Sequence, residues 1–163
     1  MSRDLDCVAK VKAWITHADT DIGAGVWDLA TDMPYTGDAV FHAQQGAEKA
    51  LKAFLAWHGV LFDATGDLAV LGRLCTQIDM TLVWVTRRAE RLTEFEWKYR
   101  YPGEPEEPSE DEAESALDLA AEVYTAIMAR LPPEVRPTPY PVFARDTRPD
   151  RGRRPARARL RLH

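Results

Sequence analysis

Apolar residues recur at helical spacing through residues 40–55, and no other feature constrains the fold of this chain as strongly. The steps of three and four residues place these side chains along one face of a helix. Such a face is stable only when other elements cover it. The stripe consists of Val40, Ala43, Ala47, Leu51, Phe54 and Leu55.

Similar stripes occupy four other segments, and residues with helix-ending or helix-capping preferences separate them. A turn over residues 33–38 lets Asp38 cap the second helix, and Gly59 ends that helix. Asp67 is placed to cap a short third helix, and Ser109 with Glu112 forms a capping box for the last. The predicted helices cover about residues 4–31, 39–58, 68–76, 82–99 and 110–131.

No alternating β pattern and no internal repeat interrupts this series, so the predicted fold class is all-α. Short connections between successive helices favour an antiparallel up-and-down bundle of four to five helices over residues 1–132. Gly23 and Gly25 weaken the first helix and mark a possible bend. Residues 133–163 are rich in proline and arginine and are predicted to form a disordered basic tail.

The charge of the chain is divided between these two parts. Residues 133–163 hold nine arginines against three acids, a net charge of +6, whereas residues 1–132 carry −11. The arginines of the tail are suited to RNA or to an acidic partner, although an extension without any function fits the composition better. The acids of residues 104–122 form a solvated face, unless the tail or Arg87, Arg88 and Arg91 of a second subunit cover them.

Several classes of protein are excluded by simple absences in the sequence. No apolar run has the length of a membrane span, and residues 1–12 are too polar for a signal peptide, so a cytoplasmic location is expected. Cys7 and Cys75 lack metal-ligand spacing and are predicted to be reduced core thiols. No metal site and no cofactor is predicted.

A polar line runs beside the apolar stripe of the second helix. Gln45, Glu48 and Lys52 follow one another at i, i+3 and i+7, which places them on one side of the helix. Glu48 and Lys52 are also spaced for an intrahelical ion pair. Charges that border an apolar face need partners, or else they face a groove that a ligand fills.

Three segments in order resemble the HEPN domain, a nucleotide-binding helical domain of higher eukaryotes and prokaryotes. Residues 44–53 read Gln-Gln-x-x-Glu-Lys-x-x-Lys-Ala and resemble the second helix of the family. Residues 18–24 are similar to the end of its first helix, and residues 100–102 resemble its Arg-Tyr-Pro signature. The resemblance covers about residues 10–132 and implies a helical bundle that forms a homodimer.

The resemblance also implies a set of ligand-binding candidates. It brings Arg100 near Glu48, where a guanidinium would either lock two helices together or meet a ligand. Beside Arg100, Tyr101 offers a ring for stacking on a base. The candidates are Asp21, Gln45, Glu48, Lys49, Lys52, Arg100 and Tyr101.

Ribonuclease members of the family resemble one another in an Arg followed, after four to six residues, by a His. Here only Arg157 and His163 have that spacing, and both lie in the predicted tail. Gly66 occupies a position where this branch of the family usually has a His. The remaining histidines are interpreted as solvated, with contact of His42 with a ligand as the alternative, and the sequence favours a protein that is not an enzyme.

The sequence therefore favours a non-catalytic module that binds a nucleotide or a partner. The resemblance implies that this partner is a small nucleotidyltransferase in a toxin–antitoxin-like system. The alternatives are a ribonuclease toxin that cleaves RNA and a structural dimeric scaffold, whose interface would use Trp14, Trp84 and Trp97.

Overall fold

The computed structural model describes residues 4–100 and 106–137, with only the backbone described for residues 96, 97, 99 and 100. These residues form helices and connections without any strand, which confirms the all-α prediction. None of the described helices is long and apolar enough to cross a membrane. The elements are α1 (Leu5–Leu29), α2 (Thr36–Trp57), α3 (Leu68–Ile78), η1 (Met80–Leu82), α4 (Val83–Arg100), α5 (Glu110–Met128) and η2 (Pro133–Val135).

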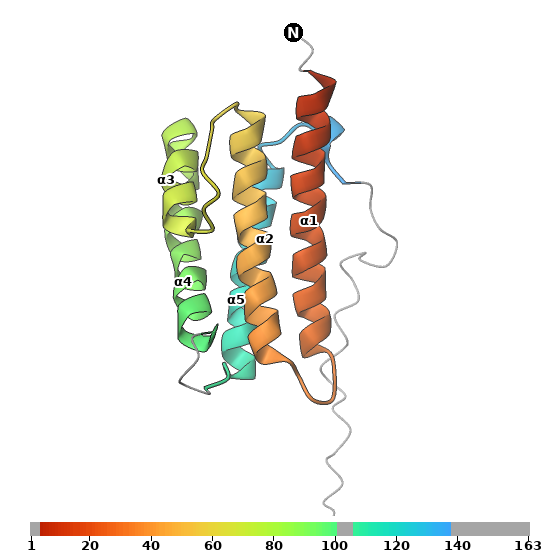
Figure 1. Cartoon of the computed structure of the whole chain (residues 1–163), viewed down its shortest axis with the longest axis vertical. Helices are drawn as coiled ribbons and strands as arrows, with labels where there is room; N and C mark the ends of the chain where they lie inside the picture. The colour runs from red at the N-terminus through yellow and green to blue at the C-terminus, as the bar shows by residue number, and fades with distance from the viewer. Residues whose placement is uncertain (1–3, 101–105, 138–163) are drawn as a thin grey trace, which may run out of the picture.

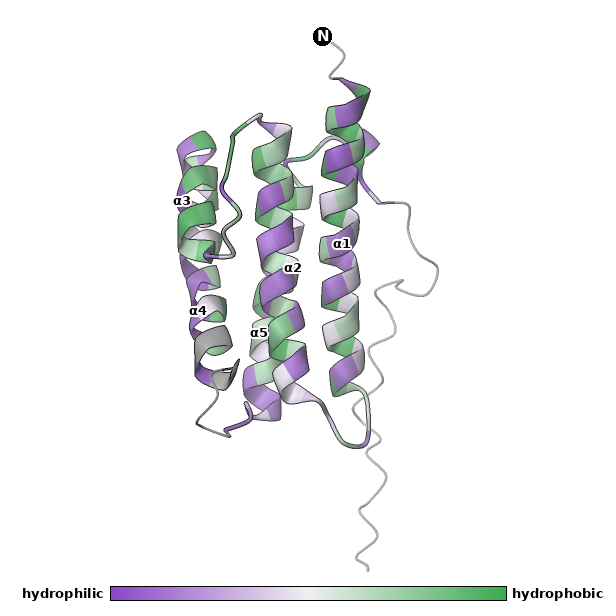
Figure 2. Cartoon of the chain, viewed as in Figure 1, coloured by the Kyte–Doolittle hydropathy of each residue, from purple (hydrophilic) through white to green (hydrophobic). Residues whose placement is uncertain are grey.

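The helices pack side by side as an up-and-down bundle. In Figure 1, α2 lies between α1 on one side and α3 and α4 on the other, and α5 passes behind it. α2 contacts all four of the other α-helices, so it is the central element of the bundle. Figure 2 shows the outward face of α2 as a mixture of polar and apolar residues.

Local capping chemistry sets most of the helix ends as predicted. The Asp67 side chain accepts a hydrogen bond from the Ala69 amide at the start of α3. Ser109 and Glu112 form both hydrogen bonds of a capping box at the start of α5. Gly59, with a φ of +69°, follows the end of α2. A left-handed residue just beyond a helix favours glycine, because other side chains are strained there.

The predicted cap of α2 is wrong. The helix begins at Thr36, after Tyr35, and no side chain caps its first amides. Asp38 lies inside the first turn, where its carboxylate still interacts favourably with the positive end of the helix dipole. The connection between α1 and α2 therefore covers residues 30–35, three residues earlier in the chain than predicted.

The hydrophobic core lies between α1, α2 and α5, with α3 and α4 covering the other side of α2. The stripe from Val40 to Leu55 is buried throughout. Leu5 and Val26, which continue the apolar pattern of α1 in the sequence, are exposed. α1 continues through Gly23 and Gly25 as one helix.

The two cysteines are free and differ in burial. Cys75 is fully buried, and burial raises the pKa of its thiol to about 12, whereas Cys7 is half-buried. Because the thiolate is the reactive form, we expect a thiol reagent at about pH 8 to leave Cys75 unmodified in the native protein. Counting reactive thiols before and after unfolding in urea measures this. Rapid native modification that a Cys75→Ser variant abolishes would contradict the assigned burial.

Candidate functional site

Glu48 is the centre of a buried polar cluster on α2. Its Oε1 atom accepts a hydrogen bond from the Lys52 ammonium at 2.6 Å. Its Oε2 atom accepts from the side-chain amides of Gln44 and Gln45, each at 3.3 Å. Glu48 and Lys52 are each only 8% exposed. The predicted Glu48–Lys52 pair therefore forms, but in a desolvated position where loss of either partner is costly.

Gln44 and Gly66 connect this cluster to the loop between α2 and α3. The Gln44 amide donates to the Gly66 carbonyl oxygen at 3.1 Å. A Cβ atom on Gly66 would lie 2.9 Å from the Oε2 atom of Glu48. Glycine at this position thus allows the loop backbone to approach the Glu48 carboxylate closely.

The Lys52 ammonium lies beneath two aromatic rings. It is 5.4 Å from the Trp14 ring and 5.9 Å from the Phe62 ring, distances that suit cation–π attraction. Trp14 and Phe62 also meet edge to face. Trp14 of α1 was predicted as an interface residue, and in the structure it packs partly buried against its own chain.

The buried cluster therefore has a structural role of its own. Hydrogen bonds from Gln44, Gln45 and Lys52 occupy both oxygens of Glu48. The predicted contact of Arg100 with Glu48 falls outside what the structure describes, since only the backbone of Arg100 is described at the end of α4. Tyr101 also lies outside the described residues.

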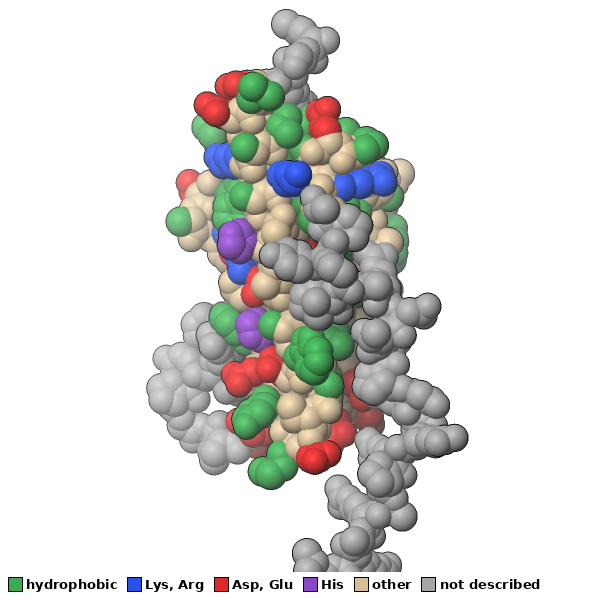
Figure 3. All heavy atoms as spheres, turned by 90° about the vertical axis from the view of Figure 1, so that its right-hand side faces the viewer, with side chains coloured by type: hydrophobic (Ala, Val, Ile, Leu, Met, Phe, Trp, Pro, Cys, Tyr) green, Lys and Arg blue, Asp and Glu red, His purple; other side chains and the backbone are tan. Residues whose placement is uncertain are grey.

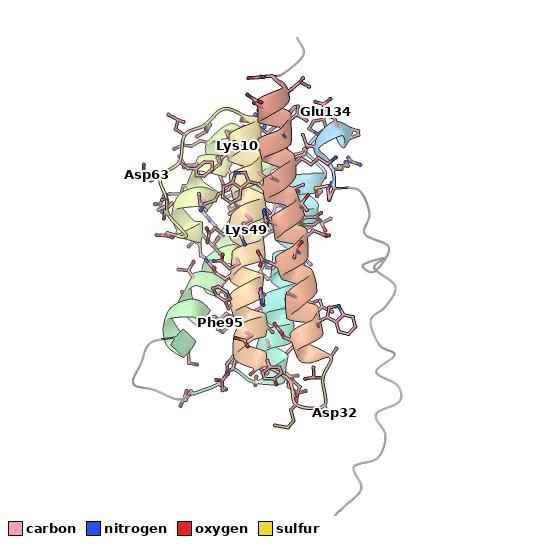
Figure 4. All side chains as sticks on the ribbon, turned by 45° about the vertical axis from the view of Figure 1, so that its right-hand side comes forward. Lys10, Asp32, Lys49, Asp63, Phe95 and Glu134 are labelled. Carbon is pink, nitrogen blue, oxygen red and sulfur yellow. The ribbon has the colours of Figure 1, made fainter. Side chains whose placement is uncertain are left out.

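A second, partly exposed cluster joins α1 to α2 around Asp21. The Asp21 carboxylate pairs with the Lys49 ammonium through Oδ2 and lies 3.3 Å from the His42 Nδ1 atom through Oδ1. On the other side of the ring, His42 Nε2 is 3.8 Å from Asp28 Oδ2. Figure 4 labels Lys49 at the seam between α1 and α2. Asp21 and Lys49, both predicted site residues, are thus in direct contact.

His42 is not the solvated histidine that the sequence predicted. Its imidazole is partly buried between two carboxylates of α1. Burial raises the pKa of Asp28, and the neighbouring Asp38 raises it further, while His42 opposes the shift. The Asp28 Oδ2 atom is buried and accepts no hydrogen bond within the described part of the chain. Asp28 was not among the predicted site residues, since only the fold brings it to His42.

The acidic face of α5 is met in part by its own chain. Arg88 of α4 contacts both oxygens of Glu122, at 2.6 and 3.4 Å. The sequence left open a solvated face, arginines of a second subunit or the tail, and the contact that forms comes instead from an arginine of the same subunit. No group of acids, histidines and cysteines in the described residues has the geometry to hold a metal ion.

The fold and this site define a small helical-bundle module whose polar contacts converge on one central helix. The chain belongs to the HEPN domain family, which matches residues 11–131. The match agrees with the range over which the resemblance was found. Membership makes the chain a module of the nucleotide- and RNA-related class in general. No curated protein and no solved structure matches it.

Proposed function

We propose that the chain is a non-catalytic HEPN module that binds a nucleotide or a protein partner through the exposed part of the α2 polar face. The proposed binding residues are Asp21, Gln45 and Lys49, which are partly exposed. Glu48 and Lys52 form a buried ion pair beneath them and have a structural role. In this proposal the chain works as a homodimer with a small nucleotidyltransferase in a toxin–antitoxin-like system.

The observation that best supports this proposal is that the charged side chains of the α2 polar face already form ion pairs within the protein. Asp21 neutralises Lys49, and Glu48 neutralises Lys52. A phosphate would have to displace a carboxylate from a lysine, so phosphate binding is disfavoured. The Gln45 side-chain amino group already donates to Gln44 and Glu48, so its carbonyl oxygen and the outer edge of the Asp21 carboxylate suit neutral donors, such as those of a base edge, a ribose or a partner's backbone.

One contact favours the ribonuclease alternative. A carboxylate that holds an imidazole in place is a common feature of general bases, and Asp21 holds His42 in this way. RNA cleavage also requires a cation for the charge that develops on phosphorus. Lys49, which shares Asp21 with His42, is paired with that carboxylate. The contact therefore supplies one of the two required groups, and the non-catalytic function is preferred.

Thermal-shift measurements with ATP, GTP and related nucleotides test the binding function. We expect one of them, alone or with a co-expressed nucleotidyltransferase, to raise the melting temperature by several degrees. Gln45→Ala should abolish this shift, and Lys10→Ala, at an exposed position of α1 away from the face, should preserve it. No shift with any nucleotide, together with no complex with the nucleotidyltransferase on gel filtration, would overturn the proposal.

Incubation with total RNA separates the two functions. The non-catalytic module leaves the RNA intact under all conditions. Cleavage that disappears in a His42→Ala variant would assign catalysis to the Asp21–His42 pair and reject the preferred function. Because His42 contacts α1, the variant's helical circular dichroism must match that of the wild type in the same experiment.

A further inference from the structure

Large apolar side chains are exposed together at the end of the bundle where α1 turns into α2. Trp27 is 60% exposed, Met33 81% and Tyr35 61%, and the exposed Val26 adjoins them. We call these four residues the end patch. Exposed tryptophan and tyrosine side chains at one place are typical of surfaces that another segment covers.

The surroundings of the end patch are acidic. Residues 13–48 contain no lysine or arginine, and Asp28, Asp32 and Asp38 lie in or beside the α1–α2 turn. The start of α5 comes to the same end, because a Cβ atom on Gly37 would lie 2.7 Å from a carboxylate oxygen of Glu107. On the face drawn in Figure 3, acidic side chains lie at both ends and apolar ones accompany them at the lower end, whereas the visible lysine and arginine side chains lie in the upper half.

The exposed aromatic rings and the carboxylates around them determine which kind of segment can bind to the end patch. RNA and other polyanions are repelled by the carboxylates. A guanidinium, in contrast, forms two parallel hydrogen bonds with a carboxylate and stacks on the face of an indole or phenol ring. An arginine-rich segment therefore matches both features of the end patch at once.

The chain carries such a segment itself. Residues 151–163 hold six arginines and no acidic residue, and they lie outside the described residues. η2, the last described element, contacts α1 near its beginning, at the opposite end of the bundle from the patch. In Figure 4, Glu134 of η2 and Asp32 of the turn are labelled at these two ends.

The intervening chain is long enough to connect the two ends. α1 has 25 residues, and at the helical rise it spans roughly 37 Å. Residues 138–150 cover up to about 43 Å when extended. We propose that the arginine-rich segment, residues 151–163, docks on the end patch of its own chain. The acidic end then competes with RNA, or any other polyanion, for the same arginines.

The indole NMR signals of the full-length protein test this docking. Trp27 lies in the patch, and Trp84 of α4 is also exposed but lies outside it, so the two signals serve as probe and internal control. Trp27→Phe and Trp84→Phe variants assign them. We expect the Trp27 signal to shift between about 0.02 M and about 0.5 M salt, since screening weakens the contact, while the Trp84 signal stays in place.

Replacing the six arginines of residues 151–163 by glutamine should move the Trp27 signal to its high-salt position and remove its salt dependence. Replacing Asp32 and Asp38 by asparagine should have the same effect, whereas replacing Asp4 and Asp63, away from the patch, should have none. A Trp27 signal indifferent to the arginines overturns the proposal. A Trp27 shift that is lost on dilution also overturns it, since the occupant would then be the segment of a second copy.

Discussion

Alanine in place of Glu48 is expected to lower the free energy of unfolding by about 3 kcal/mol. The substitution leaves the Lys52 ammonium buried without its carboxylate and deprives the Gln44 and Gln45 amides of an acceptor. Trp14 and Phe62 cover this ammonium, so water does not readily replace the lost partner. Urea unfolding followed by circular dichroism measures the change.

The exposed pair of Arg88 and Glu122 supplies the matched control. Its side chains are 55% and 38% exposed, so Glu122→Ala should cost less than about 1 kcal/mol. If the two glutamate variants lost the same small amount, Glu48 would be solvated and the structural role assigned to it would be wrong. A Glu48→Leu and Lys52→Met double variant should recover most of the loss, because it removes both buried charges.

Contacts between residues close in the sequence could be predicted, whereas contacts between residues on different helices could not. The caps at Asp67 and Ser109 depend on residues two or three positions away, and both were predicted correctly. The Glu48–Lys52 pair also lies within one helical turn and formed as expected. The buried stripe of α2 follows from its period alone.

Contacts between helices do not follow from the spacing of residues within one helix. His42 looks solvated in the sequence because Asp21 and Asp28 belong to another helix and reach it only through the α1–α2 packing. The helical period predicts that Gln45, and not Gln44, lies in line with Glu48 and Lys52. Only the loop carbonyl of Gly66 shows why Gln44 is buried. The binding roles of Arg100 and Tyr101 remain predictions, because the structure does not describe these side chains.

Valine in place of Gly46 is expected to destabilise the protein by about 3 kcal/mol. A Cβ atom at this position of α2 would lie 2.6 Å from the Ile22 Cγ1 atom and 3.3 Å from the Ala18 carbonyl oxygen. Cγ1 is close to the backbone of a β-branched residue whose χ1 is stiff in a helix, so Ile22 does not rotate away. α1 and α2 must then move apart, which disrupts the contacts of Asp21 with Lys49 and His42. Urea unfolding measures the loss.

Gly25 provides the comparison that isolates this mechanism. A Cβ atom there would lie 3.2 Å from the Ala39 carbonyl oxygen, much as at Gly46, but its closest neighbour, at 2.5 Å, is Leu117 Cδ2, the far end of a flexible side chain that can adopt another rotamer. Gly25→Ala should therefore cost clearly less than Gly46→Ala, although alanine improves helix propensity by about 1 kcal/mol at both positions. Adding Ile22→Ala should restore part of the stability of Gly46→Val, because it removes the clashing atom. If Gly25→Ala and Gly46→Ala lowered the free energy of unfolding equally, the closest approach between α1 and α2 would lie elsewhere than at Gly46.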